Sequence, residues 1–370
     1  MTTDVTESNL LIQGDSTNIL EQLNTSFSKT LKCIYMDPPY NTQNIFEHYH
    51  DAQNHDTWLQ FMKKILLECH KLLRDDGLLF VQIDDRELAY LQVLLDSIFG
   101  RENRVNLITV KMSEVSGVKM THVNKRLPKI KEFILVYSKT SNYSIQPIRK
   151  QKTPEQLLRY LRYYTKIIEN PDDPVENWVI TPVKDYMKNK GFSIEDEDIK
   201  QFQIQEKHRV VYRTNNQHLE KVSYPTKTAL HVSSTGISYI WWEAKQMLFL
   251  KDYCEEYYGD LWTDISTINL NKEGGVSFKN GKKPETLLQR ILEISTKEGD
   301  WVLDPFAGSG TTAVVAQKMN RKWLTIEQGQ QIETHCLFRL KELLEHRSKG
   351  GIDASQMSAN RGFIFLKEKS

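Results

Sequence analysis

The sequence predicts an α/β fold built on a doubly wound, mostly parallel sheet. Short apolar runs bounded by turn residues alternate along the chain with amphipathic segments of helical period. This alternation is typical of strand–helix–strand units, in which functional side chains follow the carboxyl ends of the strands. The expected strands are residues 10–12, 31–36, 78–83, 133–137, 301–303 and 321–326, and the expected helices are residues 56–73, 87–99, 284–294 and 313–318.

Local signals justify these elements in turn. The first strand runs into Gly14-Asp15, the second into Asp37-Pro38 and the third into Asp84-Asp85, so each apolar run stops at turn residues. The helix expected over 56–73 carries apolar residues close to a 3.6-residue period, at Trp58, Leu59, Phe61, Met62, Ile65, Leu66, Leu72 and Leu73. The two strands near the C-terminus end at Asp304 and Glu327.

The middle of the chain breaks this alternation. Residues 141–261 are rich in Tyr, Lys, Gln and Asn, with a helical stretch at 154–168 and β-like runs at 208–213 and 237–242. We therefore expect an inserted α+β module. The remaining boundaries are a first part of the main domain over 1–140, a second part over 262–345, and a tail over 346–370 with a further strand at 362–366.

Composition excludes several classes of protein. The 370 residues carry a formal net charge of +1, so the overall charge does not indicate a nucleic-acid partner, although residues 111–131 and 149–166 are locally basic. Those stretches could line a phosphate-binding face or be ordinary solvated helix faces. The four cysteines are scattered, and His48, His50 and His55 lack metal-site spacing, so neither a metal site nor a disulfide framework is expected. Without a signal peptide or an apolar run of ~18 residues, we expect a cytoplasmic protein with no membrane contact.

A glycine-rich motif follows the expected strand 301–303. The glycines permit a tight turn and close approach of a ligand, and the helix that follows presents free N–H groups at its N-terminus. Glu327, at the end of the next strand, suits the two hydroxyls of a ribose. Taken alone, this pattern could also be a plain glycine turn with a surface glutamate. The motif reads Asp304-Pro305-Phe306-Ala307-Gly308-Ser309-Gly310-Thr311-Thr312.

A second motif, Asp37-Pro38-Pro39-Tyr40, follows the expected strand 31–36. Its two prolines stiffen a short loop that holds one carboxylate, one free carbonyl and one aromatic ring. The Asp37 carboxylate and the Pro38 carbonyl can each accept one hydrogen of a flat amine, while Tyr40 stacks on the ring that bears it. Such a site would act by positioning and electrostatics. Taken alone, the tetrapeptide could equally be a Pro-Pro turn.

Together the two motifs resemble those of the amino-group DNA methyltransferases, and their order, with the catalytic motif first, is that of the β group. The resemblance covers about residues 10–140 and 261–345 and is closest to modification subunits of type III restriction–modification systems. The further segments that carry it are Asn41-Thr42, Gln82-Ile83-Asp84-Asp85, Phe99-Gly100-Arg101-Glu102-Asn103, Ile134-Leu135-Val136-Tyr137 and Gly281-Lys282-Lys283-Pro284.

The resemblance implies a seven-stranded methyltransferase sheet and transfer of a methyl group from S-adenosylmethionine to N6 of adenine. It also implies double-stranded DNA as substrate, flipping of the target base and target recognition by the insert. A homodimer and a restriction subunit are possible partners, and a stand-alone or phage-type enzyme is an equal alternative to a restriction complex. The implied catalytic residues are Asp37, Pro38, Pro39 and Tyr40. The implied cofactor-binding residues are Asp15, Lys283, Asp304, Pro305, Phe306, Gly308, Ser309, Gly310, Thr311 and Glu327.

Within this set the resemblance gives three residues particular roles: Asp15 would contact the cofactor adenine, Lys283 would help close the pocket, and Phe306 could offer cation–π support. Near the catalytic loop, Phe46, Tyr49 and Trp58 could line the pocket for the flipped base. We favour a helix core for Trp58 and Phe61, and a mobile closing loop for residues 46–51. The insert offers basic residues for contacts with DNA, namely Arg159, Arg162, Lys166, Lys207, Arg209 and Arg213.

Two alternatives remain at this point. Methylation of N4 of cytosine uses the same geometry, and Asp37 rather than Ser favours adenine by resemblance. A non-catalytic subunit that recognises DNA for a partner nuclease is the alternative from another functional class, and the two intact motifs argue against it.

Overall fold

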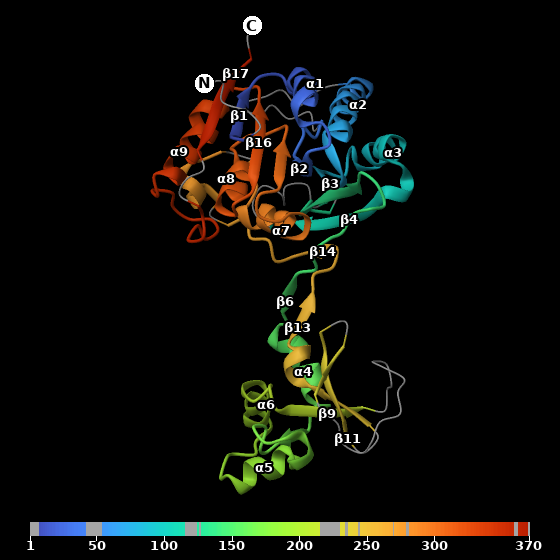
Figure 1. The fold of residues 1–370 in the computed structure, drawn as a ribbon, viewed down its shortest axis with the longest axis vertical. Helices are drawn as coiled ribbons and strands as arrows, with labels where there is room; N and C mark the ends of the chain where they lie inside the picture. The colour runs from blue at the N-terminus through green and yellow to red at the C-terminus, as the bar shows by residue number, and fades with distance from the viewer. Residues whose placement is uncertain are drawn as a thin grey trace. The chain divides into compact units, whose positions relative to one another are not determined.

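The computed structural model describes residues 7–41, 54–114, 124–125, 127–214, 230–233, 236–242, 245–268, 270–278, 281–358 and 362–368. The chain divides into two compact units, Met1–Pro147 with Gly259–Ser370, and Ile148–Tyr258 (Figure 1). The boundaries expected from the sequence, at 141 and 261, lie close to this division. Residues 46–51, where the sequence analysis places a closing loop, lie outside the described part of the chain.

The larger unit contains a nine-stranded sheet of order β14-β4-β5-β3-β2-β15-β16-β1-β17. The expected seven strands run from β4 to β1, and a short strand is added at each edge. One of these, β17, lies in the segment expected as a tail and pairs in parallel with β1. In sheet order the strands are Leu261–Trp262, Arg104–Lys111, Lys131–Ser138, Leu73–Ile83, Leu31–Met36, Trp301–Asp304, Lys322–Glu327, Asn9–Gln13 and Phe363–Lys367.

One strand direction differs from the expectation. The run at 133–137 was grouped with the parallel strands, but β5 is antiparallel to both of its neighbours, β3 and β4. Its side chains from Phe133 to Ser138 are all buried, because both faces of the sheet are covered there. A strand buried on both faces reads as a continuous apolar run in either direction, so the sequence could not show the reversal.

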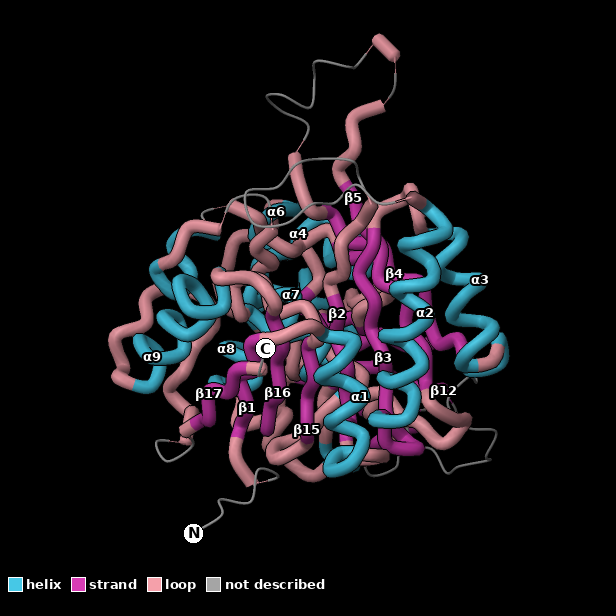
Figure 2. Tube along the Cα trace, turned by 90° about the horizontal axis from the view of Figure 1, so that it is seen from above, coloured by secondary structure: helices cyan, strands magenta, loops and turns pink. Residues whose placement is uncertain are grey.

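Helices cover both faces of this sheet (Figure 2). On one face α1, α2 and α3 pack side by side, and α7, α8 and α9 cover the other. Asp15 caps α1 by accepting hydrogen bonds from two N–H groups of its first turn, and α2 buries an apolar stripe that includes Trp58 and Met62. Their bounds are Ser16–Phe27, His55–Leu72, Leu88–Phe99, Glu285–Ser295, Thr311–Lys318 and Phe338–Leu344. Short helical turns lie at Arg101–Asn103 and Leu270–Gly275, and a π-helical segment lies at Ile332–Leu337.

The topology places the chemical motifs together. Strands β2, β15, β16 and β1 are consecutive neighbours in the sheet and all parallel. Their carboxyl ends therefore meet at one edge, where Asp37, Asp304, Glu327 and Asp15 occur. The two motifs, far apart in the sequence, thus follow adjacent strands, the usual position of an α/β active site.

The smaller unit is α+β. Its described residues form a six-stranded sheet of order β10-β11-β12-β9-β7-β8, a β6-β13 ribbon and the helices α4, α5 and α6. The sheet strands are His231–Val232, Ser238–Trp242, Lys245–Phe249, Val210–Thr214, Lys166–Ile168 and Ile180–Pro182, the ribbon is Arg149–Gln151 with Glu255–Tyr257, and the helices are α4 Pro154–Leu161, α5 Val183–Asn189 and α6 Asp196–Gln205. Short helical turns lie at Val175–Asn177 and Leu250–Tyr253.

The helix expected over 154–168 is too long. It ends at Leu161, and residues 166–168 form β7, which pairs with β8 and β9. Ile167 and Ile168 are fully buried in that sheet. Tertiary pairing, which local periodicity does not report, decides the conformation of this segment.

Within the described residues, no helix is long and apolar enough to cross a membrane. The four cysteines are buried and unpaired with one another. Across the same ranges, no cluster of three or more His, Cys, Asp or Glu side chains could hold a metal ion; His48 and His50 lie outside them.

Candidate active site

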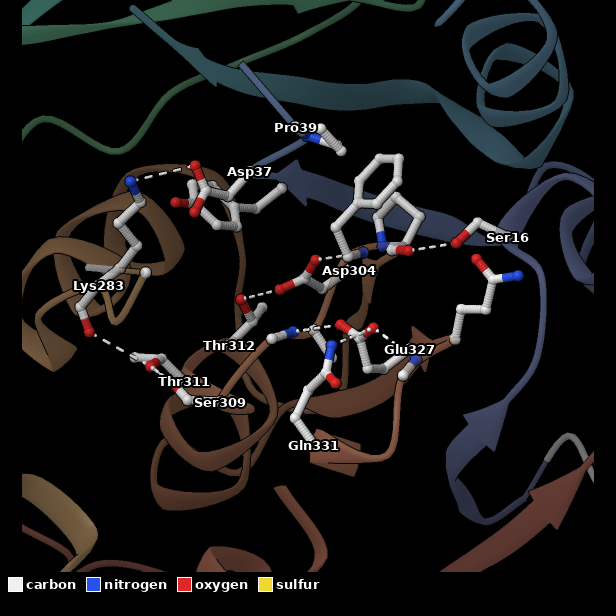
Figure 3. Close-up of a pocket in the computed structure, with 18 of the residues that line it drawn as sticks. Ser16, Asp37, Pro39, Lys283, Asp304, Ser309, Thr311, Thr312, Glu327 and Gln331 are labelled. Atoms are coloured by element: carbon white, nitrogen blue, oxygen red, sulfur yellow. Dashed lines mark hydrogen bonds and ion pairs between the residues drawn. The ribbon is translucent and has the colours of Figure 1, made fainter. Parts of the chain in front are cut away.

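A cavity of about 590 Å³ opens at the edge where the four carboxyl-terminal strand ends meet (Figure 3). Eleven of the expected site residues line it, namely Asp15, Asp37, Pro39, Lys283, Asp304, Pro305, Phe306, Gly308, Ser309, Thr311 and Glu327. Pro38, Tyr40 and Gly310 do not. The further lining residues are Ser16, Tyr35, Phe61, Phe278, Gly281, Leu288, Ala307, Thr312, Gln328, Gly329 and Gln331.

The glycine-rich loop owes its shape to two residues in the left-handed region. Gly308 has φ 51° and Gly310 has φ 77°, and Gly310 is also the N-cap of α8. A Cβ atom on Gly310 would lie 2.4 Å from Sγ of Cys336, so close packing requires glycine there as well. The Gly308 N–H donates to Oε2 of Glu327 at 2.8 Å. The loop is thereby tied to the end of the next strand.

Asp304 is a buried carboxylate at the base of this loop. Its Oδ1 accepts from the Phe306 N–H at 2.9 Å, and its Oδ2 accepts from the Thr312 hydroxyl at 2.5 Å (Figure 3). Burial raises the pKa of Asp304 to about 7, and the negative charges of Asp37 and Glu327 act in the same direction. A cation in the cavity would favour the ionised form.

Glu327 presents its carboxylate from the end of β16. Besides the Gly308 contact, Oε1 accepts from the Gly329 N–H at 3.0 Å and from the Gln331 side chain at 2.8 Å. These donors fix the carboxylate at the cavity wall. A carboxylate can accept several hydrogen bonds, so displacement of the Gln331 amide would let Glu327 accept a hydroxyl hydrogen of a ligand.

Asp15 follows β1, which lies on the side of β16 away from β15 and its glycine-rich loop. Its Oδ1 caps α1, accepting from the N–H of Thr17 at 2.8 Å and of Asn18 at 3.3 Å. The neighbouring Ser16 hydroxyl donates to the Pro305 carbonyl at 2.6 Å (Figure 3). This contact joins the start of α1 to the loop after β15.

Asp37 lies across the cavity from the glycine-rich loop, at the end of β2. Its Oδ1 accepts from the Tyr40 hydroxyl at 2.5 Å and pairs with Nζ of Lys283 at 3.1 Å. Trp58 Nε1 donates to the Pro39 carbonyl at 2.7 Å and so anchors the stiff loop to α2. Burial raises the pKa of Asp37, and Lys283 opposes that rise.

Lys283 links the two motifs. Its carbonyl accepts from the Thr311 hydroxyl at 3.2 Å on the cofactor loop, and its ammonium group reaches Asp37 (Figure 3). From the sequence, Lys283 was expected only beside the glycine-rich motif. The extended side chain carries its charge to the catalytic motif, which a position in the sequence does not reveal.

A further acidic group beside this cavity was not anticipated. Glu132, on β5, accepts through Oε2 from Lys283 at 2.9 Å and from Gln82 Nε2 at 2.6 Å, and the Tyr40 hydroxyl lies 3.0 Å away. Burial alone would raise the pKa of Glu132, but Lys283 and these donors lower it overall. In the sequence, Glu132 could have been noticed because it is a charged residue directly before the apolar run 133–137, most of which carries the family resemblance.

Two aromatic assignments can be compared with the structure. Trp58 is fully buried in the core, as expected. Phe61 packs against the same core but also lines the cavity, with its ring centroid 6.0 Å from that of Phe306. The assignment of Phe61 to a helix core alone was therefore incomplete, because its position on α2 faces both environments.

Behind the glycine-rich loop lies a buried ionic cluster. Arg339 donates to the Ser309 carbonyl at 2.9 Å, to the Thr311 hydroxyl at 3.1 Å and to Oε1 of Glu285 at 3.0 Å. Lys318 donates to the other oxygen of Glu285 at 2.8 Å. Arg339 and Glu285 are fully buried, so this cluster supports the loop from the side away from the cavity.

The comparison with protein families agrees with this geometry. The family described as DNA methylase matches residues 31–336, which include both motifs and the smaller unit. The chain belongs to this DNA methylase family.

Individual relatives are similar over most of the chain. It is 36% identical to the probable type III restriction-modification enzyme HindVI Mod subunit of Haemophilus influenzae, over 97% of this chain and 54% of that protein. It is 25% identical to the type II methyltransferase M.KpnI of Klebsiella pneumoniae, over 91% of this chain and 84% of that protein. The solved structure of PvuII DNA methyltransferase (cytosine-N4-specific) is similar with a TM-score of 0.49 and 15% identity, over 90% of this chain and 86% of that one. The chain spans about half the length of the type III Mod subunits it matches.

Proposed function

We propose that this chain transfers a methyl group from S-adenosylmethionine to N6 of adenine in double-stranded DNA. The observation that carries the proposal is that Asp37, Asp304 of the glycine-rich motif and Glu327 at the end of β16 all line one cavity. Membership of the DNA methylase family and the similarity to Mod subunits support DNA as the substrate.

The residues in the cavity fit S-adenosylmethionine. Glu327 offers a fixed carboxylate for the ribose hydroxyls, and Asp304 offers a buried carboxylate for a cationic group. Asp15 and Ser16 border the end of the cavity expected to take the adenine. Phe61 and Phe306 supply apolar ring surface. When bound, S-adenosylmethionine supplies an electrophilic methyl group on a positively charged sulfur.

The chain's own residues orient the nucleophile. Asp37 accepts one hydrogen of the target amine, and the Pro38 carbonyl accepts the other, which localises the nitrogen lone pair and directs it toward the cavity. The amine gains a methyl group and releases one proton. Asp37 is placed to receive that proton, and its raised pKa makes it a better acceptor than an exposed aspartate.

A base within a duplex cannot reach this loop, so the proposal includes base flipping, which costs a few kcal/mol of stacking and pairing. We propose the smaller unit, near residues 141–261, as the target-recognition module. Arg162 stacks on Tyr163, whereas Arg209 is partly buried in contacts with Glu206 and Tyr186, which makes Arg162 the better candidate for a DNA contact.

The partners are proposals of the same kind. A restriction subunit is suggested by the relatives named as type III Mod subunits, and a homodimer by the resemblance to the β group. A cytoplasmic location belongs to the same proposal because the proposed substrate is DNA. Co-purification with such a subunit, and light scattering of the chain alone, would test the two assemblies.

The test of function follows labelled methyl groups from S-adenosylmethionine into unmethylated DNA. We expect transfer by the intact chain and a loss of at least about a hundredfold in Asp37→Ala, with cofactor affinity changed less than about twofold. Glu342→Gln, a surface carboxylate paired with Arg347, is the matched control. Intact cofactor binding with no transfer to any DNA would refute the catalytic proposal, and loss of cofactor binding in Asp37→Ala would refute the assignment of the site.

A further inference from the structure

Two groups bind one oxygen of the catalytic carboxylate, and a third group contacts both of them. Tyr40 and Lys283 both bind Oδ1 of Asp37, and Glu132 binds Lys283 from the other side and lies within 3.0 Å of the Tyr40 hydroxyl. The three donors of the Lys283 ammonium are thus taken by Asp37, Glu132 and the Tyr40 oxygen, which lies 2.9 Å away. The ammonium is held in one place from three directions.

The other oxygen of Asp37 differs. Among the described residues, no side chain or backbone group donates a hydrogen bond to Oδ2, although Asp37 lines the cavity and its side chain is 19% exposed. The two contacts on Oδ1 fix the rotation of the carboxylate. Oδ2 is consequently the oxygen available to a ligand.

Glu132 is itself rigidly held. Gln82 donates to it from β3, and the Tyr35 hydroxyl donates to Oε1 of the same Gln82 amide at 2.6 Å. Because the Tyr35 bond fixes the amide, its N–H group points at Glu132. These hydrogen bonds link Tyr35 on β2, Gln82 on β3 and Glu132 on β5, so each of the three residues lies on an interior strand of the sheet.

We propose that Glu132 is a positioning residue for methyl transfer: it anchors Lys283 and Tyr40, which clamp Oδ1 of Asp37 and leave Oδ2 to accept the target amine. This inference rests on the proposed function. Glu132 does not line the cavity, so it acts through these two residues rather than on the cofactor or the base.

The arrangement has an electrostatic signature. The titratable groups that face Asp37 are Lys283 from the segment before α7, Tyr40 from its own loop, Glu132 from β5, Tyr35 from β2 and Asp304 from β15. Lys283 lowers the pKa of Asp37, whereas the negative charge of Glu132 raises it. Removing the charge of Lys283 should therefore raise the pKa of Asp37, and removing the charge of Glu132 should lower it.

The experiment compares Glu132→Gln, Glu132→Ala and Lys283→Gln with the intact chain and with the control Glu342→Gln. Glu132→Ala removes the anchor, so kcat should fall about a hundredfold, the effect of a misplacement near 1 Å. Glu132→Gln keeps a hydrogen-bonding oxygen and should retain much of the kcat of the intact chain. Cofactor affinity, measured by calorimetry, should change less than about twofold in both Glu132 variants.

The pH profile of kcat/KM for DNA, at saturating cofactor, provides the second readout. We expect the acid limb to move to lower pH by about one unit in Glu132→Gln and to higher pH in Lys283→Gln. A merely structural loss of stability would lower activity without moving the limb in either direction. Thermal melting of each variant shows whether it is folded, and Glu132→Gln keeps the test valid if Glu132→Ala does not fold.

An unmoved acid limb in Glu132→Gln, or the kcat of the intact chain in folded Glu132→Ala, would overturn the inference. Neither result would affect the proposed function, which fails if the intact chain transfers no methyl group to adenine in DNA.

Discussion

Replacing Asp304 by asparagine should stabilise the fold while weakening cofactor binding. The new side chain would keep the shape of the site, because its oxygen can accept from the Phe306 N–H and its amide can donate to the Thr312 hydroxyl oxygen. Only the charge is removed. Asp304 is 3% exposed, and its pKa of about 7 reflects burial of a carboxylate that has no cationic partner among the described residues.

The sign follows from proton linkage. The folded pKa is raised above the value of 3.8 expected for an unfolded chain, so the folded state holds the proton more tightly. Asp304 therefore makes its full contribution to the free energy of unfolding below about pH 4, and this contribution is lost as the pH rises through about 7. At about 1.4 kcal/mol per unit, the whole loss is about 4 kcal/mol, and the part between pH 5.5 and 8 is about 2 kcal/mol.

The assay is urea unfolding of the intact chain and Asp304→Asn at about pH 5.5 and pH 8. The free energy of unfolding of the variant minus that of the intact chain should be about 2 kcal/mol larger at pH 8 than at pH 5.5. Its affinity for S-adenosylmethionine should fall roughly 10- to 100-fold, the effect of losing a charged hydrogen bond. A stability difference independent of pH would refute the account of Asp304 as a buried, unpaired carboxylate.

Three further predictions concern the loop, its support and the smaller unit. Gly310→Ala should lower stability by about 1–3 kcal/mol, because the new Cβ meets Cys336; adding Cys336→Ala should recover the steric part, and no recovery would contradict this packing. Glu285→Gln should cost about 3–5 kcal/mol in urea unfolding by leaving Arg339 and Lys318 buried without their anion, and an unchanged midpoint would contradict it. Exchanging residues 148–258 with those of a relative should change the methylated DNA sequence, as read by sequencing; an unchanged sequence would place recognition elsewhere.

Much of the main fold could be predicted because its signals are local. Strand β2 matches the expected residues 31–36, and Asp37 follows it directly. The shape of the glycine-rich loop was likewise predictable, since glycines at 308 and 310 and the acidic end of β16 are adjacent in the sequence to the elements that position them. Each of these features follows from apolar runs and the residues that end them.

The features that escaped prediction depend on tertiary contacts. Strand β4 was not named, because its half-exposed side chains give no continuous apolar run. The role of Glu132 depends on β5 lying beside β3, which brings its carboxylate to Gln82 and Lys283. The position of the Lys283 ammonium depends on a side-chain conformation that no local pattern encodes.

The most direct test of the central claim is nucleoside mass spectrometry. The purified chain is incubated with S-adenosylmethionine and unmethylated genomic DNA, which is then digested to nucleosides. The account predicts N6-methyladenine, absent when Asp37→Ala replaces the intact chain. N4-methylcytosine alone would contradict the assignment of the base, and no methylated base despite intact cofactor binding would contradict the claim that the chain is a DNA methyltransferase.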